Sequence, residues 1–178
     1  MTATARARRP RTVEAEMAPP VRRFLEGRGY RVWVDPDGTD YFDMVARRGA
    51  EIGLVELKVD DVRKVLGQAV RRRGFADWVA VVLPRESTAR RVLTLPVPAP
   101  GQRVGVWWID GDAVRVVREA LARPTGEGDP FDGRRRALGE MLDHLESGRL
   151  AEGVSWNHLT HGRARPRREV RLDEFPET

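Results

Sequence analysis

Two acidic residues and one lysine, close together in the chain, form the set with the clearest chemical potential. Asp43 lies in a weakly alternating apolar stretch, and Glu56 and Lys58 follow in the next one. Two carboxylates suit Mg²⁺, which proteins hold through one or two such groups while water and substrate phosphate fill the remaining positions. A lysine beside the ion can orient an attacking water or stabilise charge on a phosphoryl group. This set is the minimum needed to hydrolyse a phosphodiester.

Strand geometry decides whether these three side chains can meet. Residues 41–47 and 52–59 each have the pattern of a strand, and the turn residues between them predict an antiparallel hairpin. Successive side chains point to opposite faces, so Glu56 and Lys58 are expected on one face, roughly 7 Å apart, with the core against the other. Pairing across the hairpin would bring Asp43 close to Glu56. A Glu-x-Lys pair alone is more often a solvated ion pair, so the hypothesis depends on its surroundings.

A helix is predicted ahead of the hairpin. Its apolar residues recur at steps of three and four, the spacing of one buried stripe. These residues are Val13, Met17, Val21, Phe24 and Leu25. Pro19 and Pro20 interrupt the pattern, so the helix either begins just before them or is kinked at them. Gly27 and Gly29 are typical of the end of a helix, and residues 30–34 are expected to form the first strand.

Beyond the hairpin the pattern changes to that of a parallel crossover. Residues 61–73 have helical periodicity behind an acidic N-cap and end in arginines, which favours a helix. Residues 77–83 are nearly all apolar β-formers, as expected of a strand covered on both faces and paired in parallel. A short helix at 87–92 and two strands at 104–109 and 113–117 complete the predicted core.

Changes in composition divide the chain into four segments. Residues 1–12 are basic and lack periodicity, so they are expected to form a disordered arm. Residues 13–120 contain the predicted core. Residues 121–132 are rich in proline and glycine and are expected to be a linker, and residues 133–178 form a helical and basic C-terminal extension.

The composition of the chain indicates what kind of partner it binds and excludes several kinds of chemistry. The chain has 178 residues and a formal net charge of +5, which favours an anionic partner, nucleic acid first. The absence of cysteine excludes disulfides, thiolate zinc sites and cysteine nucleophiles. No apolar run approaches the length of a membrane span, and the basic start lacks the apolar stretch of a secretory signal. No membrane association is expected, and the cytoplasm is the expected location.

Taken in order, these parts resemble the PD-(D/E)XK nuclease superfamily, which includes restriction endonucleases and Holliday-junction resolvases. Members have a helix carrying an acid, a hairpin carrying Asp and then (Asp/Glu)-x-Lys, and a further helix and strand. The corresponding parts here are Glu16 with its helix, Asp43, Glu56-Leu57-Lys58, and residues 61–73 and 77–83. Phe42 stands where many members have proline. The resemblance covers about residues 13–85 and looks most like an uncharacterised bacterial branch. It implies an α/β fold with a restriction-endonuclease-like central mixed β-sheet flanked by helices.

The resemblance also implies an activity, a divalent-metal-dependent nuclease that hydrolyses phosphodiester bonds in DNA. Asp43, Glu56 and Glu16 would hold Mg²⁺ or Mn²⁺, and Lys58 would act on the attacking water. Glu16 is preferred to Glu14 because it matches the position of the family's helix acid. The prolines of the helix leave this choice open.

Further residues carry weaker predictions. Gln68 follows Lys58 by ten residues, where several branches place a glutamine that reaches the metal site, although an exposed helix amide is an equal alternative. Arg71, Arg72 and Arg73 are candidates for phosphate contacts, although capping the helix would explain them. A homodimer is expected if two strands are cut. Two alternatives remain: a catalytically inactive nucleic-acid-binding module that retains the fold, and an unrelated α/β domain in which Glu56 and Lys58 are only structural.

Overall fold

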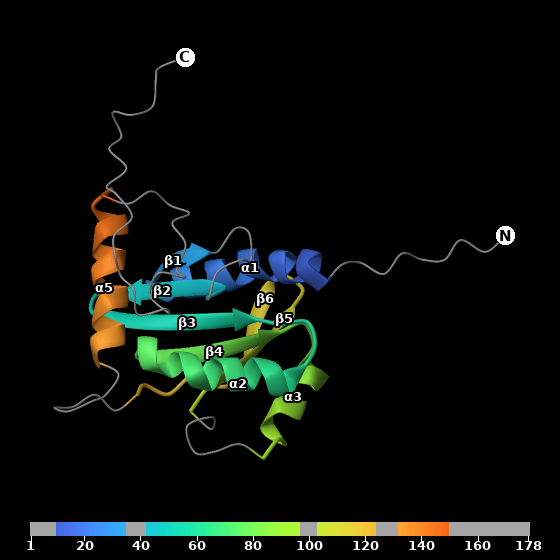
Figure 1. Ribbon diagram of the computed structural model, residues 1–178. Coiled ribbons are helices and arrows are strands. Elements are labelled where there is room, and N and C mark those ends of the chain that lie inside the picture. Colours follow the sequence, from blue (N-terminus) through green and yellow to red (C-terminus); the bar gives the residue numbers. More distant parts are fainter. Residues whose placement is uncertain (1–9, 35–41, 97–102, 124–131, 150–178) are drawn as a thin grey trace.

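A computed structural model of the chain describes residues 10–34, 42–96, 103–123 and 132–149. These residues form a six-stranded sheet in which the spatial order of the strands follows the sequence, β1-β2-β3-β4-β5-β6. Helices cover both faces of this sheet (Figure 1). The predicted α/β class, with a central mixed sheet flanked by helices, is therefore confirmed.

The N-terminal half contains one helix and the antiparallel part of the sheet. Helix α1 (Pro10–Glu26) precedes strands β1 (Arg31–Val34), β2 (Met44–Arg48) and β3 (Glu51–Leu57). β2 is antiparallel to both of its neighbours, with Met44 opposite Val55. The predicted hairpin is confirmed, although both of its strands are shorter than expected. Asp43 lies in a bend just before β2, and Lys58 just after β3.

The parallel part of the sheet begins with the predicted crossover. Helix α2 (Val62–Arg72) starts at Asp61, whose side chain accepts a hydrogen bond from the Lys64 amide, as expected of an N-cap. The short 3₁₀ helix η1 (Arg73–Phe75) then leads into β4 (Trp78–Leu83). β4 runs parallel to β3 and is buried along its whole length, as its apolar sequence predicts.

The remaining elements extend the sheet and cover it. Helix α3 (Glu86–Leu93) precedes β5 (Gly105–Asp110), which is parallel to β4, and β6 (Ala113–Arg118) is the antiparallel edge. Helix α5 (Asp132–Glu146) comes last. None of the helices within the described residues has the length and apolar character needed to cross a membrane.

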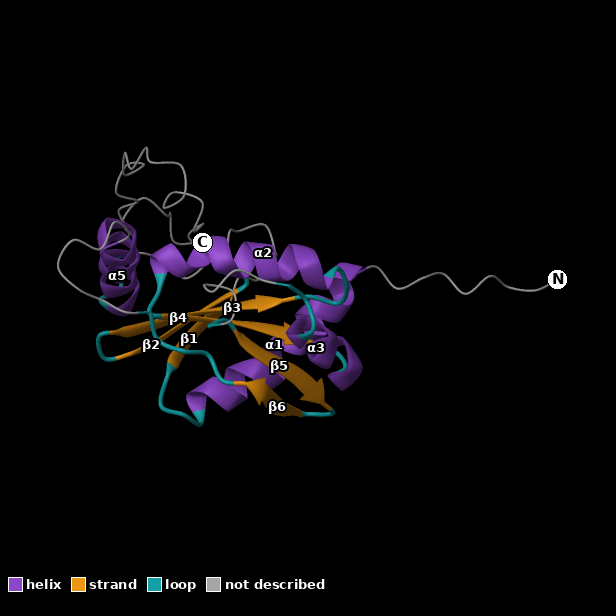
Figure 2. Cartoon of the chain, turned by 90° about the horizontal axis from the view of Figure 1, so that it is seen from below, coloured by secondary structure: helices purple, strands orange, loops and turns teal. Residues whose placement is uncertain are grey.

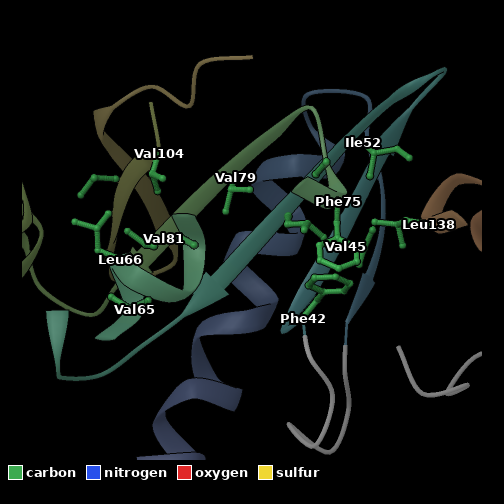
Figure 3. Packing of buried hydrophobic residues seen from close by; sticks show 14 of the residues in the cluster. Phe42, Val45, Ile52, Val65, Leu66, Phe75, Val79, Val81, Val104 and Leu138 are labelled. Atoms are coloured by element: carbon green, nitrogen blue, oxygen red, sulfur yellow. The ribbon is translucent and has the colours of Figure 1, made fainter. Parts of the chain in front are cut away.

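The sheet separates two hydrophobic clusters. On one face α2, α3 and α5 pack against side chains such as Leu54 and Val81. Figure 3 shows part of this cluster. On the other face α1 packs against Val55 and Val82, and Figure 2 shows α1 and α2 on opposite sides of the sheet. β3 and β4 therefore lie between two apolar layers, whereas the sequence predicted a core on one face of β3 only.

α1 differs most from expectation, because it is continuous from Pro10 to Glu26 with Pro19 and Pro20 inside it. It starts within the predicted disordered arm, of which residues 1–9 lie outside the described residues. Each internal proline removes a backbone donor that would normally bond the preceding turn. Met17, Val21 and Leu25 of the apolar stripe are nonetheless buried against the sheet. Tertiary packing of this face outweighs the local cost of the prolines.

A buried carboxylate holds α5 against the sheet. Asp77 accepts hydrogen bonds from the amide of Ile52, at 2.8 Å, and from Arg135 of α5 through both carboxylate oxygens, at 2.6 and 2.8 Å. Arg135 also donates to the carbonyl of Ala50. Leu138 and Leu142 of α5 belong to the same apolar cluster as α2. The helical part of the predicted C-terminal extension is thus packed into the main core.

A glycine in the centre of the sheet makes room for an aromatic ring. Gly53 of β3 pairs with Trp78 of β4. A Cβ atom at position 53 would lie 2.0 Å from the Trp78 indole. This ring in turn contacts Tyr30 edge-on and Trp107 at a tilt. The missing side chain at 53 therefore allows three aromatic rings to meet beneath α1.

Leu142→Ala tests whether α5 belongs to the core. Leu142 is fully buried, so we expect the truncation to lower the free energy of unfolding by about 2–5 kcal/mol through lost burial and a cavity. Glu140→Ala, at an exposed position of the same helix, should change it by less than about 0.5 kcal/mol. Urea denaturation followed by tryptophan fluorescence measures both. Equal midpoints for the two variants would contradict the packing described.

Candidate functional site

Asp43 is fixed against the end of β3 by its own side chain. Its Oδ2 atom accepts a hydrogen bond of 2.7 Å from the amide of Leu57. This bond joins the start of β2 to the last residue of β3, so the carboxylate lies beside the backbone that carries Glu56 and Lys58. The structure brings these three predicted residues to the same end of the hairpin.

Lys58 contacts an acid of α1. Its ammonium group donates a 2.8 Å hydrogen bond to Oε1 of Glu14, and both side chains are about one quarter exposed. Glu16, the predicted helix acid, is exposed. Residues two positions apart do not share a face of a helix. The helix acid at the site is thus Glu14, the alternative that the sequence analysis left open.

Glu56 has a different partner, on the opposite face of the sheet. Its Oε2 atom forms a buried ion pair with Arg72 near the end of α2. The guanidinium of Arg72 also lies 5.9 Å from the centre of the Phe42 ring. Glu56 and Lys58 were expected to project from one face, yet one reaches α2 and the other reaches α1. The strand ends at Leu57, so the alternation of faces does not constrain Lys58.

Burial and neighbouring charges raise the pKa of both Asp43 and Lys58. Burial raises the pKa of Asp43 above its ordinary value of 3.8; the Leu57 hydrogen bond and the charges of Arg72 and Lys58 oppose the rise only in part. Burial disfavours the charged form of Lys58, but the hydrogen bond and charge of Glu14 and the charges of Asp43 and Asp60 outweigh it and raise the Lys58 pKa. Lys58 therefore stays protonated at neutral pH and serves as a cation and hydrogen-bond donor.

The charges of this group do not balance. Three carboxylates, of Glu14, Asp43 and Glu56, lie with two cations, Lys58 and Arg72. One negative charge is left over, and the Oε1 atom of Glu56 is buried with no hydrogen-bond partner in the described part of the chain. We name these five residues the carboxylate cluster.

The carboxylate cluster contains the kind of oxygen atoms that bind a hard divalent cation. Carboxylate oxygens are the ligands that Mg²⁺ takes, and one or two are sufficient when water and substrate phosphate complete the shell. Asp43 and the Oε1 atom of Glu56 supply such oxygens. Among the described residues, however, no group of three or more His, Asp or Glu side chains is arranged to hold a metal ion. The Arg72 ion pair also occupies the second oxygen of Glu56.

The other predicted residues are placed as follows. Gln68 is half-buried in the middle of α2. Arg71 is exposed, whereas Arg72 and Arg73 are buried. Arg72 is therefore an internal counterion of Glu56 and does not offer a surface contact to phosphate. Its burial could have been anticipated, because it lies seven residues after the apolar Val65 on the same face of α2.

Comparisons with known proteins do not identify a family or a function for this chain. No protein-family model and no curated protein matches the sequence. A solved structure of a protein of unknown function from Silicibacter pomeroyi is similar at 16% identity, covering 74% of this chain and 90% of that one, with a TM-score of 0.48. A likeness at this level says nothing about function.

Asp43→Asn tests the electrostatics of the cluster. The raised pKa means that the folded protein binds this proton more tightly than the unfolded chain, so ionised Asp43 destabilises the fold at neutral pH. The asparagine oxygen can still accept from Leu57. We expect a higher Tm for the variant at pH 7, and a smaller difference from wild type as the pH falls through the raised pKa. Asp112→Asn, at a 96% exposed side chain, is the control. A lower Tm for Asp43→Asn at pH 7 would contradict the burial effect.

Proposed function

We propose that the protein is a divalent-metal-dependent nuclease that hydrolyses phosphodiester bonds in DNA. The observation that supports this is the meeting of Asp43, Glu56 and Lys58 at the end of β3, with Glu14 bonded to Lys58. These residue types can support metal-dependent phosphodiester hydrolysis, and the five residues of the cluster carry one more negative than positive charge.

Asp43 and Glu56 are the residues that would hold Mg²⁺ or Mn²⁺. A bound ion would lower the pKa of a water ligand and neutralise charge on the phosphoryl oxygens. Asp43 is held in place for this role by the Leu57 amide. Arg72 balances the charge of Glu56, because a carboxylate buried without a counterion is strongly unfavourable.

Lys58 acts as a donor rather than a base in this proposal. Its pKa is raised, so it keeps its proton at neutral pH. A fixed cation beside the reacting phosphate stabilises the charge that builds up in the transition state. Glu14 fixes the ammonium group by a single hydrogen bond. It is a positioning residue, since it acts through Lys58.

DNA as partner follows from the chemistry of the cluster and from the net charge of +5. Cytoplasmic location belongs to the same proposal. Assembly as a homodimer is its corollary where both strands of a duplex are cut, since each cluster would serve one strand.

A second function has a specific observation in its favour. The buried ion pair between Glu56 and Arg72 removes one carboxylate oxygen from a metal shell. A protein that kept the fold and the basic charge but lost catalysis would bind nucleic acid with this pair left intact. The two functions differ in one measurable respect: only the nuclease consumes its substrate.

Plasmid cleavage tests the proposal. The purified protein should nick or cut DNA with Mg²⁺ or Mn²⁺, and EDTA should stop it. Asp43→Ala and Lys58→Ala should each lower the rate by about 100-fold or more, while circular dichroism shows them folded. Binding without cleavage in either metal would favour the inactive module, and wild-type rates in both variants would exclude the mechanism.

Two neighbouring acids of α1 provide a matched comparison. Glu14→Gln removes the charge that holds Lys58 and should lower the cleavage rate about 10-fold. Glu16→Gln makes the same chemical change at an exposed position two residues away, and its rate should stay within about twofold of wild type. Initial rates across pH 6 to 9 separate the variants. The reverse order of effects would assign the helix acid to Glu16.

A further inference from the structure

Helix α2 carries charge of one sign on its outer side. Its sequence, from Val62 to Arg72, contains no acidic residue. The inner side, which includes Val65 and Leu66, packs into the core. The exposed residues within the helix are Arg63, Lys64 and Arg71. We name these three residues the basic face of α2.

The cations of the basic face are not neutralised within the described part of the chain. Their side chains form no ion pair or hydrogen bond there. The other α-helices each pair an exposed arginine with an acid one turn away. These pairs are Arg22 with Glu26 in α1, Arg90 with Glu86 in α3, and Arg136 with Asp132 in α5. Since α2 has no acid of its own, its charge is available to an outside anion.

Two acids just before α2 have other roles. Oδ1 of Asp61 accepts a hydrogen bond from the amide of Lys64 and so caps the helix. The charge of Asp60 acts on Lys58. Both acids lie at the N-terminal end, where negative charge offsets the helix dipole. Arg71 is ten residues further on, or about 15 Å along the helix axis.

A glycine in the middle of the basic face is not required by packing. Gly67 lies four residues after Arg63 and four before Arg71, so the three positions share one stripe. Among the described residues, a Cβ atom at position 67 would meet only Nη1 of Arg71, at 3.5 Å, which is an ordinary contact. Glycine is unfavourable inside a helix relative to alanine, but it lets a ligand approach the backbone closely. The stripe thus has an open stretch between two cations.

We propose that the basic face of α2 binds the phosphate backbone of duplex DNA. This inference rests on the proposed function for the choice of DNA as the anion, and it names the surface that holds it. Arg63 and Arg71 are roughly 12 Å apart along the helix. Over that length of duplex axis one strand carries about three or four phosphates. Contacts to phosphate carry no base sequence information, so binding is expected to be independent of sequence.

The position and composition of α2 favour this partner. The helix also supplies Arg72 to Glu56, so the basic face has a fixed position relative to the carboxylate cluster. A lipid surface is a poorer match, because helices that lie on membranes bury large apolar side chains. None of the exposed residues of α2 is apolar.

The salt dependence of DNA binding tests the basic face. A fluorescent duplex is titrated with the full chain in EDTA, which prevents cleavage, and anisotropy gives Kd at several salt concentrations. Arg63→Gln/Arg71→Gln should weaken binding about 10-fold or more near 0.1 M salt and reduce the slope of log Kd against log salt by about 1.8, because two phosphate contacts are lost. Arg22→Gln/Arg136→Gln removes the same charge from paired positions and should change Kd by less than about twofold.

Gly67→Glu provides an independent test in which stability and binding change in opposite directions. The new carboxylate would lie one turn from both Arg63 and Arg71 and could form the ion pairs that α2 lacks. We expect the Tm to rise and the DNA affinity to fall about 10-fold or more. Gly67→Gln makes a change of the same size without charge. Its Tm should also rise, while its Kd should stay within about threefold of wild type.

Three results would overturn the inference. They are no duplex binding by wild type in about 50 mM salt, equal Kd for the two double variants, and equal Kd for Gly67→Glu and Gly67→Gln. Cleavage assays separate this inference from the proposed function. Binding through α2 without cleavage in Mg²⁺ or Mn²⁺ supports the basic face and rejects the nuclease. Cleavage at the wild-type rate by Arg63→Gln/Arg71→Gln, at subsaturating protein, rejects the basic face and leaves the nuclease standing.

Discussion

The position of β3, between β2 and β4 and between two apolar layers, is the constraint on which the rest of the structure depends. Every residue from Ile52 to Leu57 is buried. A charged side chain in such a strand needs a charged partner, because desolvation of a lone carboxylate costs several kcal/mol. Glu56 obtains this partner from α2, the helix that links β3 to its parallel neighbour. The crossover helix therefore joins β3 to β4 and also supplies the counterion of the acid inside β3.

The same constraint explains why the carboxylate cluster contains residues from helices on both faces of the sheet. Glu56 is inside the strand and must face α2, while Lys58 is beyond the last strand residue and can turn toward α1. Asp43 sits between them because its carboxylate takes the Leu57 amide as a hydrogen-bond donor. The end of β3 thus brings together an acid of α1, Glu14, and a cation of α2, Arg72.

Periodicity was sufficient to predict most of the elements, because amphipathic stripes and apolar runs determine local structure directly. It predicted the hairpin and the crossover within a few residues, and a helical segment somewhere within residues 133–178. It failed where tertiary packing decides: the burial of α1 carries the helix through Pro19 and Pro20, and a second layer covers the face of β3 that was expected to be open. The three residues Asp43, Glu56 and Lys58 could be selected from the sequence. Their pairing with Glu14 and Arg72 could not be predicted, because both contacts depend on how α1 and α2 are rotated against the sheet, and sequence spacing does not specify that angle.

The contact between Gly53 and Trp78 has a consequence for how this chain can vary. An added Cβ at 53 would lie 2.0 Å from the indole of Trp78, so any other residue at 53 would force this buried ring to move. A smaller residue at 78 would remove the obstacle but leave Tyr30 and Trp107 without their shared neighbour. Positions 53 and 78 are thus expected to change together or not at all. In a set of homologous sequences they would appear as a covarying pair that marks the register of β3 against β4.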